Sequence, residues 1–267
     1  LELLQEEILK KYRRPAGTSK ELQGEALENY RKPAGTPEVQ QEVHNKLKGH
    51  LNLKENLGFR ILAGTPEQFQ AALGQQGAAR IYLESSAFPR VSLPQQFKGL
   101  ARKAQGSGKE CYLALPYVFR METARWFSGN WQEIAKAGAD GYLVRNYEEI
   151  QFLKEMGVSP ECVQGDYGIY GYSKEALQGL SQLPFRQRTL PAELNFKELK
   201  GIGCEGGELV VYGYQPVMVS SQCLWKNTSG CTHKSGISYL KDRFGKQFPV
   251  QSQCGDCYNI IYNTSPL

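Results

Sequence analysis

The chain has little histidine, and it lacks the motifs typical of hydrolases and of nucleotide-binding enzymes. Only His44, His50 and His233 occur among its 267 residues. The sequence contains no Ser-His-Asp or Cys-His arrangement in a recognisable context, no HExxH signature and no GxGxxG loop. A self-contained hydrolase is therefore poorly supported, and a dinucleotide-binding sheet is not favoured.

Long apolar runs are missing as well. No stretch approaches the roughly 18 apolar residues of a membrane span, and no signal-peptide pattern follows Leu1. We therefore expect a cytoplasmic protein with no membrane partner. Because the first residue is Leu rather than Met, we expect a piece of a longer protein, with a missing N-terminal domain as the partner of this part.

Neither sign of charge dominates the composition. The 32 Lys and Arg residues against 27 Asp and Glu give a net charge of +5, and the basic residues are spread along the chain. Such a surface is compatible with an RNA partner without requiring one. A hydrophobic content of 40% is ordinary for a globular protein, and the length of 267 residues predicts one large domain with an appendage.

Residues 1–57 are rich in Glu, Gln and Lys and contain a short repeat. The stretch YRRPAGT at 12–18 recurs as YRKPAGT at 30–36. Each copy ends in a helix start, because Thr18 and Glu21 have capping-box spacing and Pro37 follows Thr36. We predict a helical arm or linker here.

Residues 58–212 alternate short apolar runs with amphipathic segments, which is typical of βαβ units and a parallel sheet. The predicted strands are Phe59–Leu62, Arg80–Leu83, Cys111–Leu115, Gly141–Val144, Cys162–Gln164, Arg186–Leu190 and Glu208–Tyr212. The predicted helices are Pro66–Leu73, Pro94–Ala104, Asn130–Ala137, Tyr147–Met156, Lys174–Leu183 and Leu194–Gly201. We predict an α/β fold, a (β/α) barrel-like parallel array that is incomplete or closes irregularly.

Residues 213–267 form a small cysteine-rich subdomain in this interpretation. The alternation stops after Tyr212, and a hairpin is predicted from Ser238–Lys241 and Gln247–Val250. The segment has little apolar content with which to fold alone. A bound metal would supply stabilisation, because metal binding is coupled to folding.

The strongest chemical signal is a set of four late cysteines: Cys223, Cys231, Cys254 and Cys257. Cys223 and Cys231 form one pair along the chain, and Cys254 and Cys257 form a C-x-x-C pair. Two pairs on loops can converge on a four-sulfur centre, which suits zinc or an iron–sulfur cluster, and the spacing does not choose between these two groups. His233, two residues after Cys231, is a further ligand candidate, a proton donor or simply exposed. Cys111 and Cys162 lie in apolar strand patterns and are predicted core residues.

Polar side chains follow several predicted strands, where barrel enzymes collect their active sites. Arg145, Glu193 and Asn195 are the catalytic candidates, although each taken singly is also compatible with helix capping or a surface position. Tyr212 and Tyr214 follow the last predicted strand in the same way. The stretch Lys241–Arg243 is compatible with anion binding or with a hairpin-turn ion pair.

Several stretches together resemble the collagenase-like U32 peptidase family. They are VVYGYQPVMVSSQC at 210–223, YLKDR at 239–243, FPV at 248–250, and Cys254 to Asn259, with LVRN at 143–146 and LPAELN at 190–195 upstream. The resemblance covers roughly residues 59–267. It implies long bacterial relatives with a preceding (β/α) barrel.

The resemblance implies two kinds of activity. The family is named for collagenase-like peptidase activity in a few members. Others act in oxygen-independent hydroxylation of tRNA or rRNA bases, or of a quinone precursor, with a four-cysteine [4Fe–4S] cluster. Carried over to this chain, the cluster ligands are the four late cysteines. We expect an iron–sulfur-dependent RNA base hydroxylase, with a peptidase or a non-catalytic, zinc-stapled binding module as alternatives.

Overall fold

The computed structural model describes residues 58–267 except 186, 205, 229 and 232. The chain divides into two units, residues 1–57 and residues 58–267. The arm predicted for residues 1–57, with its repeat, lies outside the described residues. Among the described residues, no helix combines the length and the apolar character needed to cross a membrane.

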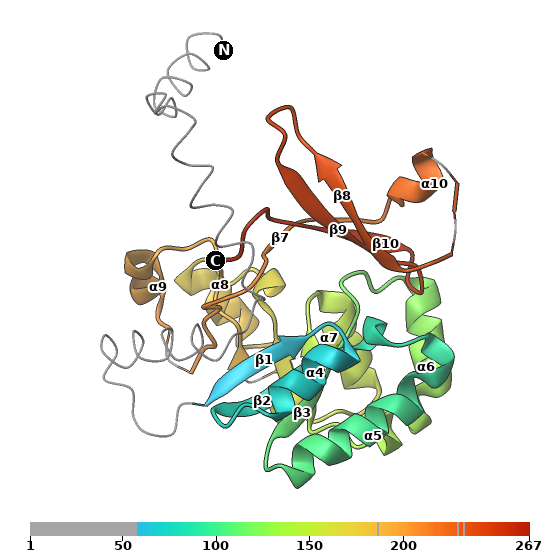
Figure 1. Cartoon of the computed structure of the whole chain (residues 1–267). Helices are drawn as coiled ribbons and strands as arrows, with labels where there is room; N and C mark the ends of the chain where they lie inside the picture. The colour runs from blue at the N-terminus through green and yellow to red at the C-terminus, as the bar shows by residue number, and fades with distance from the viewer. Residues whose placement is uncertain (1–57, 186, 205, 229, 232) are drawn as a thin grey trace. The chain divides into compact units, whose positions relative to one another are not determined.

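Six parallel strands form a sheet that curls into half of a barrel, and its order follows the chain (Figure 1). The strands are β1 (Phe59–Ala63), β2 (Ala78–Glu84), β3 (Glu110–Ala114), β4 (Gly141–Val144), β5 (Val163–Gly165) and β6 (Gln187–Arg188). Every neighbouring pair is parallel. The prediction of an incomplete (β/α) barrel-like array is therefore confirmed.

Helices connect the strands, as the alternating pattern predicts. They are α4 (Pro66–Leu73), α5 (Leu93–Gly106), α6 (Met121–Lys136), α7 (Tyr147–Glu155), α8 (Lys174–Leu180) and α9 (Phe196–Ile202), with 3₁₀ turns η1 (Ser85–Ala87), η2 (Arg90–Ser92), η3 (Pro160–Cys162) and η4 (Tyr167–Ile169). Caps begin several of them: the Thr65 hydroxyl accepts the Gln68 N–H at 3.2 Å, and Pro66 follows at the first helical position. Helix α6 begins nine residues before the predicted Asn130.

The two faces of the half-barrel sheet differ in character because side chains alternate along each strand. Ile81, Leu83 and Leu113 belong to the large buried core that the helices complete, where Phe97 and Phe127 are each at most 2% exposed. A second, smaller cluster occupies the other, interior face and consists of Tyr82, Tyr112, Ala114 and Leu143. Strand alternation and pairing place Arg80, Glu84, Arg145 and Gln164 on this interior face too.

The predicted strand Glu208–Tyr212 is wrong: it is reduced to a single parallel bridge between Thr189 and Glu208. Its apolar residues do not enter the core, and Leu209 and Val211 remain 49% and 40% exposed. Besides the two backbone hydrogen bonds of this bridge, the Glu208 carboxylate accepts the Tyr82 hydroxyl at 2.8 Å. Side-chain bonds of this kind fix the end of the segment without requiring a strand ladder.

The prediction that Cys111 and Cys162 lie in the core is confirmed for the first and wrong for the second. Cys111 is fully buried in the core, as the apolar pattern of its strand predicts. Cys162 is only partly buried, because it ends the 3₁₀ turn η3 before β5 begins, so its prediction as a core residue is wrong. Cys204 is exposed.

A second, antiparallel sheet follows, in the order β7-β10-β9-β8. Its elements are β7 (Pro216–Ser220), the short helix α10 (Leu224–Thr228), β8 (Gly236–Lys241), β9 (Gln247–Gln253) and β10 (Tyr258–Tyr262). The predicted hairpin is confirmed, since Ser238 pairs with Val250 and Lys241 with Gln247. Val250, Tyr258 and Ile260 are the buried apolar residues of this sheet, each at most 2% exposed.

Two glycines provide a matched test of the packing. A Cβ on Gly141, at the start of β4, would lie 2.4 Å from Tyr112 Cε2 and 2.5 Å from the Cys162 carbonyl oxygen. We expect Gly141→Ala to lower the free energy of unfolding in urea by about 1–3 kcal/mol through overpacking. Gly129 in α6 has open space around the same position, so Gly129→Ala should raise stability by about 1 kcal/mol. Equal stability of Gly141→Ala and the parent chain would contradict this packing.

Candidate functional site

Arg145 joins the carboxyl ends of four neighbouring strands. It directly follows β4, and its guanidinium donates to both carboxylate oxygens of Glu84, at 2.6 and 3.0 Å. Its Nε donates to Asp166 Oδ2 at 3.0 Å, and Nη1 donates to the Leu115 carbonyl at 2.6 Å. Glu84 ends β2, Leu115 follows β3 and Asp166 follows β5. We call Glu84, Arg145 and Asp166 the Arg145 cluster.

The Arg145 cluster is buried, and this determines its electrostatics. Arg145 is 5% exposed and Asp166 6%. Burial disfavours the charge of Arg145, but the facing Glu84 carboxylate, Tyr117 and Asp166 outweigh it and hold the arginine pKa well above its ordinary value. Burial raises the pKa of Glu84, and Asp166 adds to the rise while Arg145 opposes it. With two carboxyls sharing one guanidinium, Glu84 is a group that can hold a proton.

Aromatic side chains surround this cluster. The Tyr117 ring lies 3.9 Å from Arg145 Cζ, a cation–π contact. Burial raises the pKa of the Tyr167 phenol to about 12, with Asp166 contributing. Tyr258 and Tyr262 of β10 also have raised pKa values, chiefly through burial, and Glu84 and Arg145 influence both. Strand β10 of the second sheet therefore adjoins the ends of the half-barrel strands.

Glu149 supports the cluster from helix α7. Its side chain is fully buried, and its Oε2 accepts the backbone N–H of Arg145 at 2.6 Å. The amide oxygen of Asn146 accepts the Glu149 N–H at 2.9 Å, which caps the helix and fixes the turn between β4 and α7. Burial raises the pKa of Glu149 to about 8, against these hydrogen bonds, which lower it. The Glu149 carboxyl therefore fixes the backbone of Arg145 from the buried side of helix α7.

The catalytic candidates from the sequence have different surroundings. Arg145 lies in the buried cluster, whereas Glu193 and Asn195 lie in an exposed segment. Asn195 and Glu198 form a capping box: Asn195 Oδ1 accepts the Glu198 N–H at 3.1 Å and Glu198 Oε2 accepts the Asn195 N–H at 2.8 Å. Glu193 is a hydrogen-bond partner of Tyr172. Tyr212 and Tyr214 are 46% and 42% exposed.

Sequence reasoning missed Glu84 and Asp166. Both were detectable from their positions, because Glu84 directly follows the predicted strand Arg80–Leu83, and Asp166 lies just beyond the predicted strand Cys162–Gln164. The signal is a charged residue placed at the end of a buried strand, where parallel neighbours bring such residues together.

The four late cysteines gather at one end of the second sheet. The end of β7 pairs with the start of β10 through Ser220 and Asn259, and the start of β8 pairs with the end of β9 through Gly236 and Ser252. The β7–β8 connection, which carries Cys223 and Cys231, therefore meets the β9–β10 turn, which carries Cys254 and Cys257. Two hydrogen bonds join these segments: Asn259 Nδ2 donates to the Gln222 carbonyl at 2.8 Å, and the Cys254 N–H to Ser235 Oγ at 3.1 Å.

The thiols influence one another. Burial raises the pKa of Cys254, and the thiols of Cys223, Cys231 and Cys257 each raise it further. Soft thiolate donors suit zinc or an iron–sulfur cluster, so the donor set fits either group. Within the described ranges, however, no three or more His, Cys, Asp or Glu side chains are arranged to hold a metal ion. A metal would have to draw the loops together. His233 is exposed, with a φ of 53°.

Asp256, between Cys254 and Cys257, anchors the cysteine turn to the half-barrel. Its Oδ1 accepts from Arg90 Nη2 at 2.5 Å and from the Thr123 hydroxyl at 3.1 Å, and its side chain is 7% exposed. Arg90 lies in η2 and Thr123 in α6. Since Tyr258 follows this turn directly and adjoins the Arg145 cluster, one short segment connects the thiols to the strand ends.

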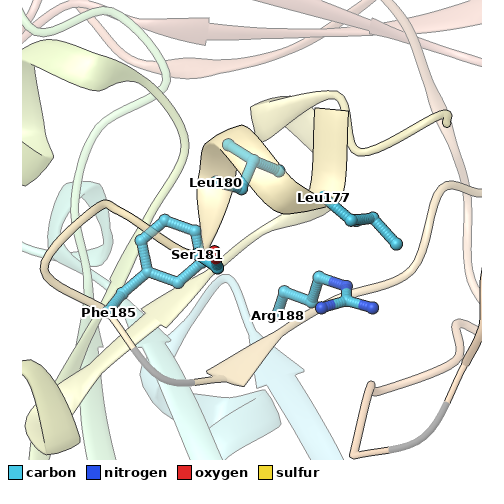
Figure 2. Close-up of a pocket in the computed structure, with 5 residues that line it drawn as sticks. All are labelled: Leu177, Leu180, Ser181, Phe185 and Arg188. Atoms are coloured by element: carbon cyan, nitrogen blue, oxygen red, sulfur yellow. The ribbon is translucent and has the colours of Figure 1, made fainter. Parts of the chain in front are cut away.

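A cavity of about 150 Å³ lies beside α8 and β6 (Figure 2). It is lined by Leu177, Leu180, Ser181, Phe185 and Arg188. The Arg188 guanidinium donates to the Gly203 carbonyl at 3.3 Å. None of these lining residues belongs to the Arg145 cluster or to the cysteine set, and we assign the cavity no role.

The architecture defines the class of protein: a (β/α) half-barrel followed by an antiparallel sheet that carries four thiols. The chain belongs to peptidase family U32, whose sequence model matches residues 64–247. The matched span includes the Arg145 cluster, Cys223 and Cys231, and it ends before Cys254 and Cys257. None of the curated proteins matches the chain at a significant level.

Solved structures that resemble the chain are distant. Thiamine phosphate pyrophosphorylase from Pyrococcus furiosus is 14% identical, with a TM-score of 0.35, over 56% of this chain and 67% of that one. O-succinylbenzoate synthase from Thermosynechococcus elongatus BP-1 is 17% identical, with a TM-score of 0.40, over 73% and 68%.

Breaking the Arg145 cluster has an expected energetic signature. Arg145→Met leaves two buried carboxyls without their guanidinium and should lower the free energy of unfolding by about 3–5 kcal/mol. Adding Glu84→Gln removes one of those charges and should recover part of the loss. Arg102→Met, on the exposed side of α5, should change stability by less than about 0.5 kcal/mol. A double variant less stable than Arg145→Met would refute the pairing; urea unfolding measures all three.

Glu149 should make stability depend on pH. Its folded pKa of about 8 lies above the ordinary value of 4.5, so the folded state binds the extra proton between these values. The free energy of unfolding should therefore fall as pH rises from about 5 to 8. Glu149→Gln should remove this part of the slope, whereas Glu148→Gln, one residue earlier and exposed, should keep it. Parallel pH profiles for the parent and Glu149→Gln would contradict the assignment.

Proposed function

We propose that the chain is the C-terminal part of an iron–sulfur-dependent enzyme that hydroxylates RNA bases without molecular oxygen. The observation that supports the proposal is the convergence of four cysteines, from two connections of the second sheet, next to a strand that adjoins the Arg145 cluster. Cys223, Cys231, Cys254 and Cys257 would hold a [4Fe–4S] cluster. When bound, such a cluster supplies electron-transfer chemistry that protein side chains lack.

The residues of the half-barrel have distinct roles in this proposal. Arg145 holds Glu84 and Asp166 in fixed positions and keeps both acceptors oriented along the strand ends. Glu84 holds or releases a proton at its carboxyl, and Glu149 orients the Arg145 backbone. Tyr258 restricts water at this edge, since it is 2% exposed, and the partly buried Tyr262 lies beyond it on the same strand. The catalytic role of Glu193 and Asn195 stays a prediction.

The family description favours a second candidate, a peptidase. Such an enzyme needs an activated nucleophile or a metal-bound water with an open coordination position. Four cysteine ligands close the coordination of zinc and make it structural. If zinc occupied the cysteine set, a peptidase would therefore have to use other residues for catalysis. A zinc-bound chain without such residues would be a zinc-stapled binding module.

Metal content and absorbance separate these functions. We expect anaerobically purified protein to contain about four iron atoms per chain and to absorb broadly in the visible range. Cys254→Ser should abolish both signals, whereas Cys204→Ser, an exposed cysteine outside the set, should leave them unchanged. Zinc in place of iron would support the stapled module. Iron-free protein that cleaves a peptide, with cleavage intact in Cys254→Ser, would overturn the proposal in favour of the peptidase.

The RNA part of the proposal has its own readout. Nucleosides from the RNA of cells that express the full-length parent protein should include a base one oxygen atom heavier, detected by mass spectrometry. The same product should be missing from cells that express only Cys254→Ser. Equal amounts of hydroxylated base in both would show that the cysteine set is not needed.

A further inference from the structure

Strand β8 exposes an apolar and basic face at the edge of the second sheet. Ile237, Tyr239 and Lys241 alternate along the strand and therefore share one face. Ile237 is 68% exposed and Tyr239 62%. Large apolar side chains exposed together on a sheet face are typical of a binding surface.

Strand pairing places this face on the same side of the sheet as the tyrosines near the Arg145 cluster. Ile237 pairs with Gln251, which pairs with Ile260. Paired residues share a face, and so do Tyr258, Ile260 and Tyr262 by alternation along β10. The exposed β8 side chains therefore continue a surface that begins at the ends of the half-barrel strands.

The turn between β8 and β9 presents more side chains of the same two kinds. Phe244 is 75% exposed, and the Arg243 guanidinium lies 4.6 Å from the centre of its ring. Asp242 Oδ1 accepts the N–H groups of Phe244 and Lys246, at 2.8 and 2.9 Å, and Gly245 has a φ of +82°. The one carboxylate of the turn is thus used to fix its conformation.

Positive charge dominates this hairpin. Residues 234–246 contain Lys234, Lys241, Arg243 and Lys246 against the single acid Asp242, and the four cations are exposed. Proteins bind single-stranded nucleic acid by stacking aromatic rings on the bases and by placing cations against the phosphates. A protein partner at a sheet edge is less favoured, because edge lysines oppose strand pairing.

We propose that the face of Tyr239 and Lys241, with the turn of Arg243, Phe244 and Lys246, binds single-stranded RNA and leads it toward the Arg145 cluster. The choice of RNA rests on the proposed function. The stacking and phosphate contacts rest on the exposed residues themselves. We call these five residues the hairpin surface.

The test is binding of a fluorescent, unstructured 12-nucleotide RNA to the full chain, followed by anisotropy at several salt concentrations. Tyr239→Ala/Phe244→Ala should weaken binding at least tenfold, and Tyr239→Phe, which keeps the ring, should bind like the parent. Phe196→Ala removes an equally exposed phenylalanine on α9 and should change affinity less than twofold. Loss of binding in Phe196→Ala equal to that in the double variant would overturn the proposal.

The cations have a separate signature. Replacing Lys241, Arg243 and Lys246 by Ala should weaken binding at least tenfold and reduce the slope of log affinity against log salt by about 2, since each phosphate contact contributes about 0.7. A control removes three exposed cations of the outer helices: Arg102, Lys103 and Lys154. An unchanged slope in the first variant, or an equal change in the control, would refute the hairpin surface.

Competing strands test the partner. A hairpin surface for single-stranded RNA is overturned if the parent chain binds no RNA, or if an RNA duplex competes as well as the single strand. The readout needs no turnover, so it is separable from the proposed function. Iron-free protein that binds RNA through the hairpin would support this inference and contradict the proposed iron–sulfur cluster. Iron-loaded protein that binds no RNA would support the cluster and overturn this inference.

Discussion

The ionic contact between Arg145 and two buried carboxyls is the constraint on which the site depends. It crosses the carboxyl ends of β2, β3, β4 and β5, the four inner strands of the half-barrel sheet, and fixes the side chains at those ends relative to one another. A buried ion pair is stable only when its remaining hydrogen bonds are satisfied and water is kept away. Tyr117 covers one side of the guanidinium, and β10 adjoins the other elements of the cluster.

That requirement explains why the second sheet carries its tyrosines where it does. The sheet has few buried apolar residues, and its outer strands β7 and β8 are largely exposed. Tyr258 and Ile260 of β10 are buried, and Asp256 anchors the preceding turn to Arg90 and Thr123. The same short segment carries Cys254 and Cys257, so the position of the thiols is set partly by the half-barrel.

Local patterns in the sequence were sufficient for most of the fold. Strands β2, β3 and β4 are recognisable because they are largely buried, mostly apolar and separated by helical patterns, and Arg145 is recognisable because it directly follows β4. Glu84 carries the same signal, because it directly follows the predicted strand Arg80–Leu83. The sequence from Asn195 to Glu198 has capping-box spacing, and that local explanation accounts for Asn195 without a ligand. Glu208–Tyr212 has strand composition, but a strand also needs a partner along its whole length.

The sequence alone does not show which strands of the second sheet pair with one another. The gathering of the cysteines depends on which strands pair and in what register, and spacing along the chain contains neither. The family match reaches residue 247 and so includes two of the four thiols. The central claim is therefore that the second sheet brings all four thiols to one centre beside the Arg145 cluster. Anomalous diffraction at the iron absorption edge, from crystals of anaerobically purified protein, tests it most directly. We expect one iron peak enclosed by Cys223, Cys231, Cys254 and Cys257, whereas iron bound elsewhere, or a cysteine turned away from the peak, would contradict a shared centre.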